Sequence, residues 1–345
     1  VAGFDMGKKK KQAENTIAAG YTLDYVSEEP IRETKKELVR QRVIRALIHE
    51  YGFSPEDMEL DFSIGGRKKV DVAIFRHDEE HTIENISRAA ICRPEPNVGK
   101  NAVRIRDFDQ AAKDLDELES IMQEVDAIKY GLWTNGLEFF FLEKEKKRFE
   151  TKCNPIGDWP VAEESVGTKD VVSDAHTRVA DNEMLKITFR RCHNYIHGNE
   201  GMPKDAAFWQ FLYLIFCKMH DEALRVKQRQ AWRRRFWAGP KEQFDVDGRK
   251  AIRERIEELF AEVKKQYRNI FRGNEEIALS DRALAFIVSE LAKYDFGRSS
   301  IDAKGAAYQE LVGVNLRGDR GQYFTPRGVV DLVVEMLDPK DGEIV

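Results

Sequence analysis

The chain has 345 residues and a net charge of −5, and 34% of its residues are charged and 42% hydrophobic. This length and apolar content predict two or three packed domains. The acidic balance excludes a globally basic nucleic-acid binder, so any DNA contact would have to come from local basic patches. There is no signal peptide, no apolar run long enough to cross a membrane and no cysteine framework. We therefore expect a cytoplasmic protein without membrane contact.

Residues 1–30 read as a flexible basic tail. The run from Lys8 to Lys11 is most simply solvated, and contact with a nucleic acid backbone is the alternative. Residues 31–150 then show the periodicities of a mixed α/β domain in the order helix, hairpin, strand, helix, hairpin. The expected elements are a helix over 38–51 ended by Gly52, strands over 58–64 and 70–74, a strand near 89–92, a helix over 107–124, and a hairpin of 127–133 with 137–142 around Asn135-Gly136.

This domain resembles the N-terminal nuclease-like domain of type I restriction R subunits. Four stretches carry the resemblance: Glu37-Leu38-Val39-Arg40-Gln41, Tyr51-Gly52-Phe53, Gly66-Arg67-Lys68-Lys69-Val70-Asp71-Val72 and Tyr130-Gly131-Leu132-Trp133-Thr134-Asn135-Gly136. The resemblance implies the PD-(D/E)xK signature, with an Asp on the second strand and Glu-x-Lys on the third. In that chemistry two carboxylates hold a divalent metal ion against the scissile phosphate, and the lysine orients the attacking water.

The signature is incomplete in this chain. Asp71 matches the first carboxylate and Glu37 a helix glutamate that sometimes assists, but Ile91-Cys92-Arg93 stands where the family has Glu-x-Lys. Ile91 cannot bind a metal ion, so we expect no Mg²⁺ and a pseudonuclease kept for DNA contact or docking. Its vestigial site would comprise Asp71, Glu37 and Arg93. The alternatives are an active nuclease that uses Glu84 or Glu95 in migrated positions, or a purely structural domain.

Residues 151–182 are polar, rich in Pro and Gly and without periodicity, and we assign them as a linker. Residues 183–300 show apolar helical stripes and predict a helical bundle. This block resembles the helical N-terminal portion of type I M subunits, because the stretch from Phe208-Trp209 to Glu222 is similar to a family helix that ends in K-x-x-D-E. The resemblance implies a role in clamping duplex DNA and in assembly.

Two constellations in the helical block suggest further sites. Zinc is one interpretation of Cys192, His193, His197, Cys217 and His220, but their spacing fits no zinc motif and favours structural histidines and buried cysteines. The second constellation is the segment 225–237, with six cations and three aromatics. It could contact phosphates and bases, or it could be a solvated helix end whose aromatics join the core. The candidate DNA-binding residues are Arg225, Lys227, Arg229, Arg233, Arg234 and Arg235.

Residues 301–345 predict the start of a doubly wound sheet. Thr325 is a good N-cap and Pro326 fits the first helical position. An apolar stripe from Val329 to Leu337 follows, and Pro339 ends the helix. The residues Glu343-Ile344-Val345 would then begin a buried strand, which is the order of elements at the opening of a Rossmann-like domain.

This C-terminal segment resembles the adenine-N6 DNA methyltransferase domain of type I restriction-modification M subunits. The stretches that carry the resemblance are Tyr308-Gln309-Glu310-Leu311-Val312-Gly313, Gly321-Gln322-Tyr323-Phe324-Thr325-Pro326-Arg327 and Leu337-Asp338-Pro339. It implies that Tyr323, Phe324, Thr325 and Pro326 contact S-adenosylmethionine, although the Tyr-Phe order is the reverse of the family's. The family's D-P-x-x-G-S-G loop and catalytic N-P-P-F/Y motif are absent, so these 345 residues should not methylate DNA by themselves.

The sequence thus predicts an α/β plus α protein: a nuclease-like α/β domain, a central helical bundle, and the start of a Rossmann-like methyltransferase domain. The function it implies is the N-terminal portion of a site-specific adenine-N6 DNA methyltransferase subunit of a restriction-modification or phage-defence system. Such a chain would bind double-stranded DNA and assemble with specificity (S) and restriction (R) subunits, and the full-length protein would use S-adenosylmethionine. The alternatives are a DNA-binding or assembly protein without catalysis, and a metal-dependent nuclease.

Overall fold

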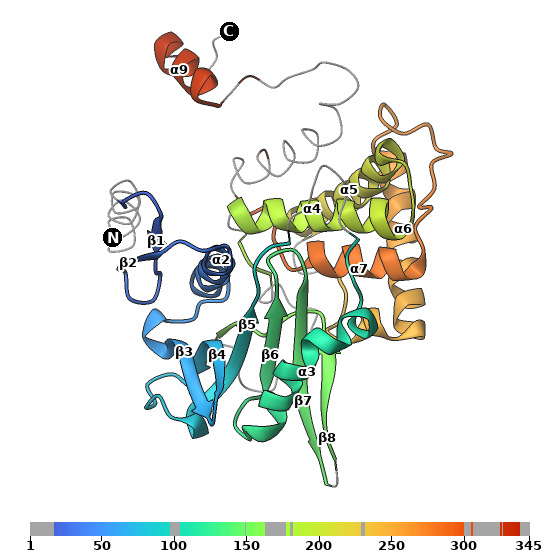
Figure 1. The fold of residues 1–345 in the computed structure, drawn as a ribbon. Helices are drawn as coiled ribbons and strands as arrows, with labels where there is room; N and C mark the ends of the chain where they lie inside the picture. The colour runs from blue at the N-terminus through green and yellow to red at the C-terminus, as the bar shows by residue number, and fades with distance from the viewer. Residues whose placement is uncertain are drawn as a thin grey trace.

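The computed structural model describes residues 17–96, 104–148, 150–162, 177–179, 182–228, 232–299, 305, 325 and 327–338. Two lobes in contact make up most of it (Figure 1). The first is a sheet with helices on its faces, and the second is a layer of helices at one end of that sheet. We call them the sheet lobe and the helical lobe.

The sheet lobe has six strands in the order β3-β4-β5-β6-β7-β8. Their bounds are β3 Met58–Gly65, β4 Lys68–Phe75, β5 Ile86–Cys92, β6 Tyr130–Thr134, β7 Phe139–Lys147 and β8 Glu150–Ile156. Only β5 and β6 pair in parallel, and helix α3 (Phe108–Glu124) makes the connection between them. The predicted order of hairpin, strand, helix and hairpin is therefore confirmed, including the turn at Gly136, whose φ of +85° suits glycine.

The two faces of this sheet are covered by different helices. Helix α2 (Lys35–His49) packs Val39, Val43 and Leu47 onto one face, where they meet Val72 and Cys92. Helix α3 packs onto the other face, and its capping box between Asp107 and Gln110 fixes where it begins. Alternating side chains of the central strands β4 and β5 are thus buried on both sides, which explains their nearly continuous apolar composition.

Two boundaries differ from the prediction. Residues 21–32, mostly assigned to the flexible tail, include a short antiparallel ribbon of β1 (Tyr21–Leu23) and β2 (Pro30–Arg32). Residues 150–156, assigned largely to the linker, form the edge strand β8. Strands of three residues are too short to show alternation, and β8 is polar and contains Pro155, which only an edge strand tolerates readily. Residues 1–16 and 163–176 lie outside the described parts.

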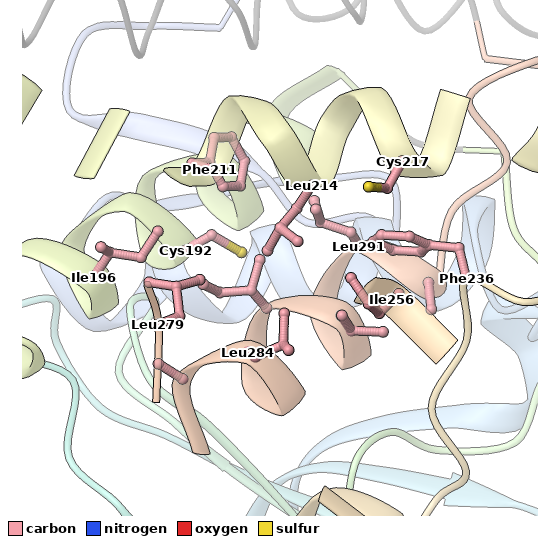
Figure 2. Packing of buried hydrophobic residues seen from close by; sticks show 14 of the residues in the cluster. Cys192, Ile196, Phe211, Leu214, Cys217, Phe236, Ile256, Leu279, Leu284 and Leu291 are labelled. Carbon is pink, nitrogen blue, oxygen red and sulfur yellow. The ribbon is translucent and has the colours of Figure 1, made fainter. Parts of the chain in front are cut away.

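The helical lobe contains α4 (Asn182–Asn199), α5 (Lys204–Gln228), α6 (Val246–Gln266) and α7 (Asp281–Ala292), as the apolar stripes predicted. Figure 2 shows their shared core, in which Cys192 of α4 and Cys217 of α5 lie among Phe211, Leu214 and Leu291. Both cysteines are fully buried and behave as small apolar residues.

The zinc interpretation finds no geometric support among the residues that the structure describes. His193 is buried, and burial lowers its pKa to about 4. His197 approaches the Met202 carbonyl oxygen through Nδ1 at 2.6 Å. Within the described ranges no three His, Cys, Asp or Glu side chains are grouped so that they could hold a metal ion.

The lobes are joined by a buried polar network around Arg178. Its backbone N–H donates to the Lys293 carbonyl oxygen at 2.9 Å, and its own carbonyl oxygen accepts from Asp295 N–H at 2.8 Å. The Arg178 guanidinium lies 2.8 Å from Asp158 and 3.9 Å above the ring centroid of Tyr51, both from the sheet lobe. Residues far apart in the sequence therefore fix the two lobes against one another.

A second ion cluster at the same junction is centred on Glu290 of α7. Its side chain is 6% exposed and pairs with Arg191 of α4 and, at 2.7 Å, with Lys293. The Arg191 guanidinium also lies 4.7 Å from the ring centroid of Phe139 in the sheet lobe. Glu290 thus holds two buried cations at the place where the lobes meet.

At the C-terminal end, helix α9 spans Arg327–Leu337, as the apolar stripe predicted. Its large apolar side chains, such as Val330 and Met336, are exposed. The residues 339–345, which would begin the predicted doubly wound sheet, lie outside the described ranges. No helix in the described parts is both long and apolar enough to cross a membrane.

Candidate functional site

Asp71, the predicted first carboxylate of the nuclease-like site, lies on β4 and is 7% exposed. Both of its oxygens contact protein groups. Oδ1 is paired with the Lys36 ammonium of α2, and Oδ2 accepts from the backbone N–H of Cys92 at 2.7 Å. The Arg93 guanidinium lies 3.6 Å from the same Oδ2. Asp71 is therefore neutralised by cations of this chain.

Glu37, the second predicted carboxylate, is also occupied. It lies on α2, is 7% exposed, and accepts from Arg40 Nε at 3.0 Å and from Gln41 Nε2 at 2.7 Å. The same Arg40 reaches Asp61 of β3 at 2.7 Å. The Glu37 side chain therefore serves an ion-pair network between α2 and β3.

The third-strand motif separates its side chains between the two faces of the sheet. Ile91 is 1% exposed and belongs to the core under α3, whereas Cys92 belongs to the core under α2. Burial raises the pKa of the Cys92 thiol well above its usual range, which keeps it neutral and a poor metal ligand. Arg93 follows β5 and also pairs with Glu117 of α3.

Among the residues that the structure describes, no three His, Cys, Asp or Glu side chains are grouped around Asp71 so that they could hold a metal ion. A magnesium site needs oxygen ligands in near-octahedral geometry. Here Asp71, Glu37, Asp61 and Glu117 are each paired with Lys36, Arg40 or Arg93. Three side-chain cations of this chain are therefore paired with the described carboxylates of the predicted site.

The two alternative glutamates lie at different places along β5. Glu84 lies in a turn before β5 (Ile86–Cys92), so about 20 Å of strand separates it from Arg93. Glu95 lies closer, but its Oε2 pairs with Arg42 of α2 at 3.3 Å. Of the two, only Glu95 is near the Asp71 end of the strand.

Several cations of the predicted basic segment contact other groups of the chain, and Arg233 donates to the Trp232 carbonyl oxygen at 3.0 Å. Arg225 pairs with Asp295 at 2.6 Å, and Arg235 makes a two-pronged contact with Glu262 at 2.6 and 2.8 Å. Arg234 donates to the Ala292 carbonyl oxygen. Lys227 and Arg233 are exposed, and Arg229 lies outside the described residues. Lys227 and Arg233 are thus the most exposed of the described cations in the segment.

The K-x-x-D-E sequence at the end of the apolar helix has a structural role that sequence reasoning missed. Lys218 is 1% exposed and pairs with Glu222 at 2.7 Å. Asp221 accepts from the backbone N–H groups of Arg235 at 2.9 Å and Phe236 at 2.8 Å. Glu222 also accepts from Gly297 N–H at 2.9 Å. The motif therefore holds two loops against α5 by hydrogen bonds: the basic segment at Arg235-Phe236 and the loop at Gly297.

The predicted cofactor loop is largely outside the described ranges. The structure does not describe Tyr323, Phe324 and Pro326. Thr325 is described and is exposed just before α9. Their contact with S-adenosylmethionine stays a prediction.

Comparison with known proteins addresses the sheet lobe. Residues 35–157 match the family model of the type I restriction enzyme R protein N terminus. This span runs from α2 through β8 and contains Asp71, Glu37 and Arg93. No curated protein and no solved structure matches the chain. The R-subunit resemblance of the sheet lobe is confirmed, and because the match ends before the helical lobe, the M-subunit resemblance is untested.

Proposed function

We propose that residues 35–157 form a nuclease-like domain that no longer cleaves DNA and serves a restriction-modification protein in DNA binding and assembly. The observation that carries this proposal is the occupation of Asp71 by Lys36, Arg93 and the Cys92 N–H. The negative charge of Asp71 is already balanced by neighbouring cations, so binding a metal ion would gain little electrostatic energy. Ile91 supplies no second ligand. The match to the N terminus of type I restriction R proteins supports the assignment of the domain to a restriction-modification system.

Cleavage of supercoiled plasmid DNA tests this proposal. With Mg²⁺ or Mn²⁺ present, the wild-type chain and the Asp71→Ala variant should both leave the plasmid intact, because neither can hold the metal ion. Nicking by the wild-type protein that disappears in Asp71→Ala would instead establish an active nuclease. The same variant of Glu95 would then show whether that residue acts as the migrated ligand.

DNA contact is expected at the exposed end of the basic segment. The double variant Lys227→Glu, Arg233→Glu should weaken duplex binding and reduce the salt slope of log K by roughly 1 to 2, since each lost phosphate contact removes about 0.9. Arg235 is left unchanged because it pairs with Glu262. The matched control is Lys113→Glu, an exposed lysine on α3. A salt slope that stays at the wild-type value would remove this segment from the DNA surface.

We further propose that the chain is the N-terminal portion of a site-specific adenine-N6 DNA methyltransferase subunit that works with S and R subunits. Support comes from the G-Q-Y-F-T-P stretch and from helix α9, which begins two residues after Thr325. The full-length protein should transfer a methyl group from S-adenosylmethionine to adenine in duplex DNA, measured by mass spectrometry of digested nucleosides. Absence of N6-methyladenine with the full-length protein and its subunits would favour the assembly role alone.

A further inference from the structure

A cleft of about 540 Å³ lies between the two lobes, away from the Asp71 site. Its sheet-lobe wall includes Lys129, Tyr130 and Trp159, and its helical-lobe wall includes Trp237 and Lys293. The cleft has the size of a pocket for a small molecule. It is near the beginning of β5 and β6, whereas Asp71 and Arg93 are near the end of β5. It is therefore a separate site.

The lining is rich in cations. Lys129, Arg178, Arg234, Lys241 and Lys293 line the cleft, against the two carboxylates Glu143 and Asp158. Some of these cations already have partners: Lys241 lies 3.0 Å from Glu143, and Arg178 lies 2.8 Å from Asp158. Lys129 is exposed, lies 5.0 Å from the ring centroid of Tyr130, and has no carboxylate partner among the described residues. It is available to an anion in the cleft.

Arg88 supplies a second observation from behind the same wall. Its side chain is buried, with 5% of the residue exposed, and its Nε has no hydrogen-bond partner. The contacts of its guanidinium within the described residues are neutral: the rings of Phe53 and Tyr130 at 4.6 and 5.2 Å, Ser87 Oγ at 3.4 Å and the Pro160 carbonyl oxygen at 3.5 Å. Burial lowers the pKa of Arg88 to about 10.

A buried guanidinium without a carboxylate is costly, and an anion nearby would reduce that cost. Tyr130 and Pro160 both contact Arg88 and both line the cleft. An anionic group bound beside Tyr130 would therefore lie close to Arg88 and within reach of Lys129. Of the three aromatic residues that line the cleft, Trp159 is 3% exposed and belongs to the core under α2, so Tyr130 and Trp237 provide the surface on which a flat ring can pack.

We propose that this cleft binds a ligand that carries both a phosphate group and a flat ring, which is the chemistry of a nucleotide. Lys129 and Arg88 attract the phosphate, and the aromatic wall holds the ring. Two sources share this chemistry: a free mononucleotide, and the 5′-phosphorylated end of a DNA strand. The site does not depend on the nuclease-like residues, so its test is independent of the function proposed above.

Calorimetric titration of the whole chain tests the proposal. The ligands are AMP, adenosine, inorganic phosphate and a short 5′-phosphorylated single-stranded oligonucleotide. AMP should bind at least about tenfold more tightly than adenosine or phosphate alone, because the site recognises both parts. The same oligonucleotide without its 5′-phosphate controls for binding of the strand at the basic segment. Preference for the 5′-phosphorylated oligonucleotide over both this control and AMP would identify a DNA end as the source, and preference for AMP would identify a free nucleotide. Binding by neither would overturn the proposal.

Charge reversal at the cleft provides the matched test. Lys129→Glu should weaken binding of the preferred ligand by about tenfold or more, and the melting temperature should stay near that of the wild type because Lys129 is exposed. Lys113→Glu reverses an exposed lysine on α3, which covers the sheet face opposite to Tyr130, and should leave binding unchanged. Equal binding by the two variants would contradict the proposed site.

Discussion

Replacing Glu290 by glutamine should lower the free energy of unfolding by about 3 to 5 kcal/mol, the usual cost of leaving buried charges without their partner. Glu290 is 6% exposed and pairs with both Arg191 and Lys293, which are themselves 5% and 10% exposed. The glutamine has nearly the same shape but no charge, so the two cations stay buried and lose their counter-ion. Chemical denaturation followed by circular dichroism measures the change.

The matched control is Glu257→Gln in α6. Glu257 pairs with Arg253 one helical turn away, but it is 55% exposed, and such pairs contribute only about 0.5 kcal/mol. A similar loss of stability in both variants would show that the buried cluster is no stronger than a surface pair. The comparison separates burial from the mere presence of an ion pair.

The pKa of Glu290 determines how the free energy of unfolding should depend on pH. Burial alone would raise its pKa, but the adjacent Arg191 and Lys293 cations lower it below the ordinary value. A carboxyl group with a lowered pKa in the folded state stabilises the protein above its unfolded pKa of about 4.3. That contribution should be lost as the pH falls from there through the folded pKa, and the loss should be smaller in Glu290→Gln.

Replacing Asp221 by alanine should cost about 3 kcal/mol and loosen the basic segment. Asp221 is 1% exposed and accepts from the backbone N–H groups of Arg235 and Phe236 and from Trp232 Nε1 at 3.3 Å. Without the carboxylate the two backbone donors lose their acceptor, whereas Trp232 Nε1 keeps the Asp221 carbonyl oxygen at 3.0 Å. Each buried unpaired group costs about 1 to 3 kcal/mol. Denaturation gives the total, and hydrogen exchange of the Arg235 and Phe236 amides locates it.

Asp221→Asn is the conservative comparison. An asparagine keeps one oxygen acceptor at nearly the same place, so the amides of Arg235 and Phe236 should exchange more slowly in this variant than in Asp221→Ala. Unchanged exchange in both variants would mean that the segment is held by the pair between Arg235 and Glu262 instead. The experiment thus separates the two anchors of the segment.

The order of elements could be predicted because periodicity is a local signal. The stripe of Leu38 to Tyr51, the alternation around Asp71 and the Asn135-Gly136 turn each occupy a few consecutive residues. They correspond to α2, β4 and the β6–β7 hairpin. Strand β8 was missed because its residues are half exposed and polar, and its pairing with β7 depends on its partner rather than on its own pattern.

The candidate site was predicted only in part. The loss of the metal-binding glutamate is visible in Ile91, but the pairing of Asp71 with Lys36 joins residues 35 positions apart. The pairing of Arg191 with Glu290 spans 99 positions. Such contacts are made by the tertiary fold, so no local sequence pattern predicts them. Composition likewise indicated a basic patch at 225–237, but not that Arg225 and Arg235 are committed to Asp295 and Glu262.

We propose that Lys36 and Arg93 of the chain itself have replaced the metal ion at Asp71. Titration of Mn²⁺ followed by electron paramagnetic resonance tests it directly, because free and bound Mn²⁺ differ in signal. We expect the wild-type chain and Asp71→Asn to leave the free Mn²⁺ signal equally unchanged up to millimolar concentrations. Binding of Mn²⁺ by the wild-type chain that Asp71→Asn abolishes would contradict the account.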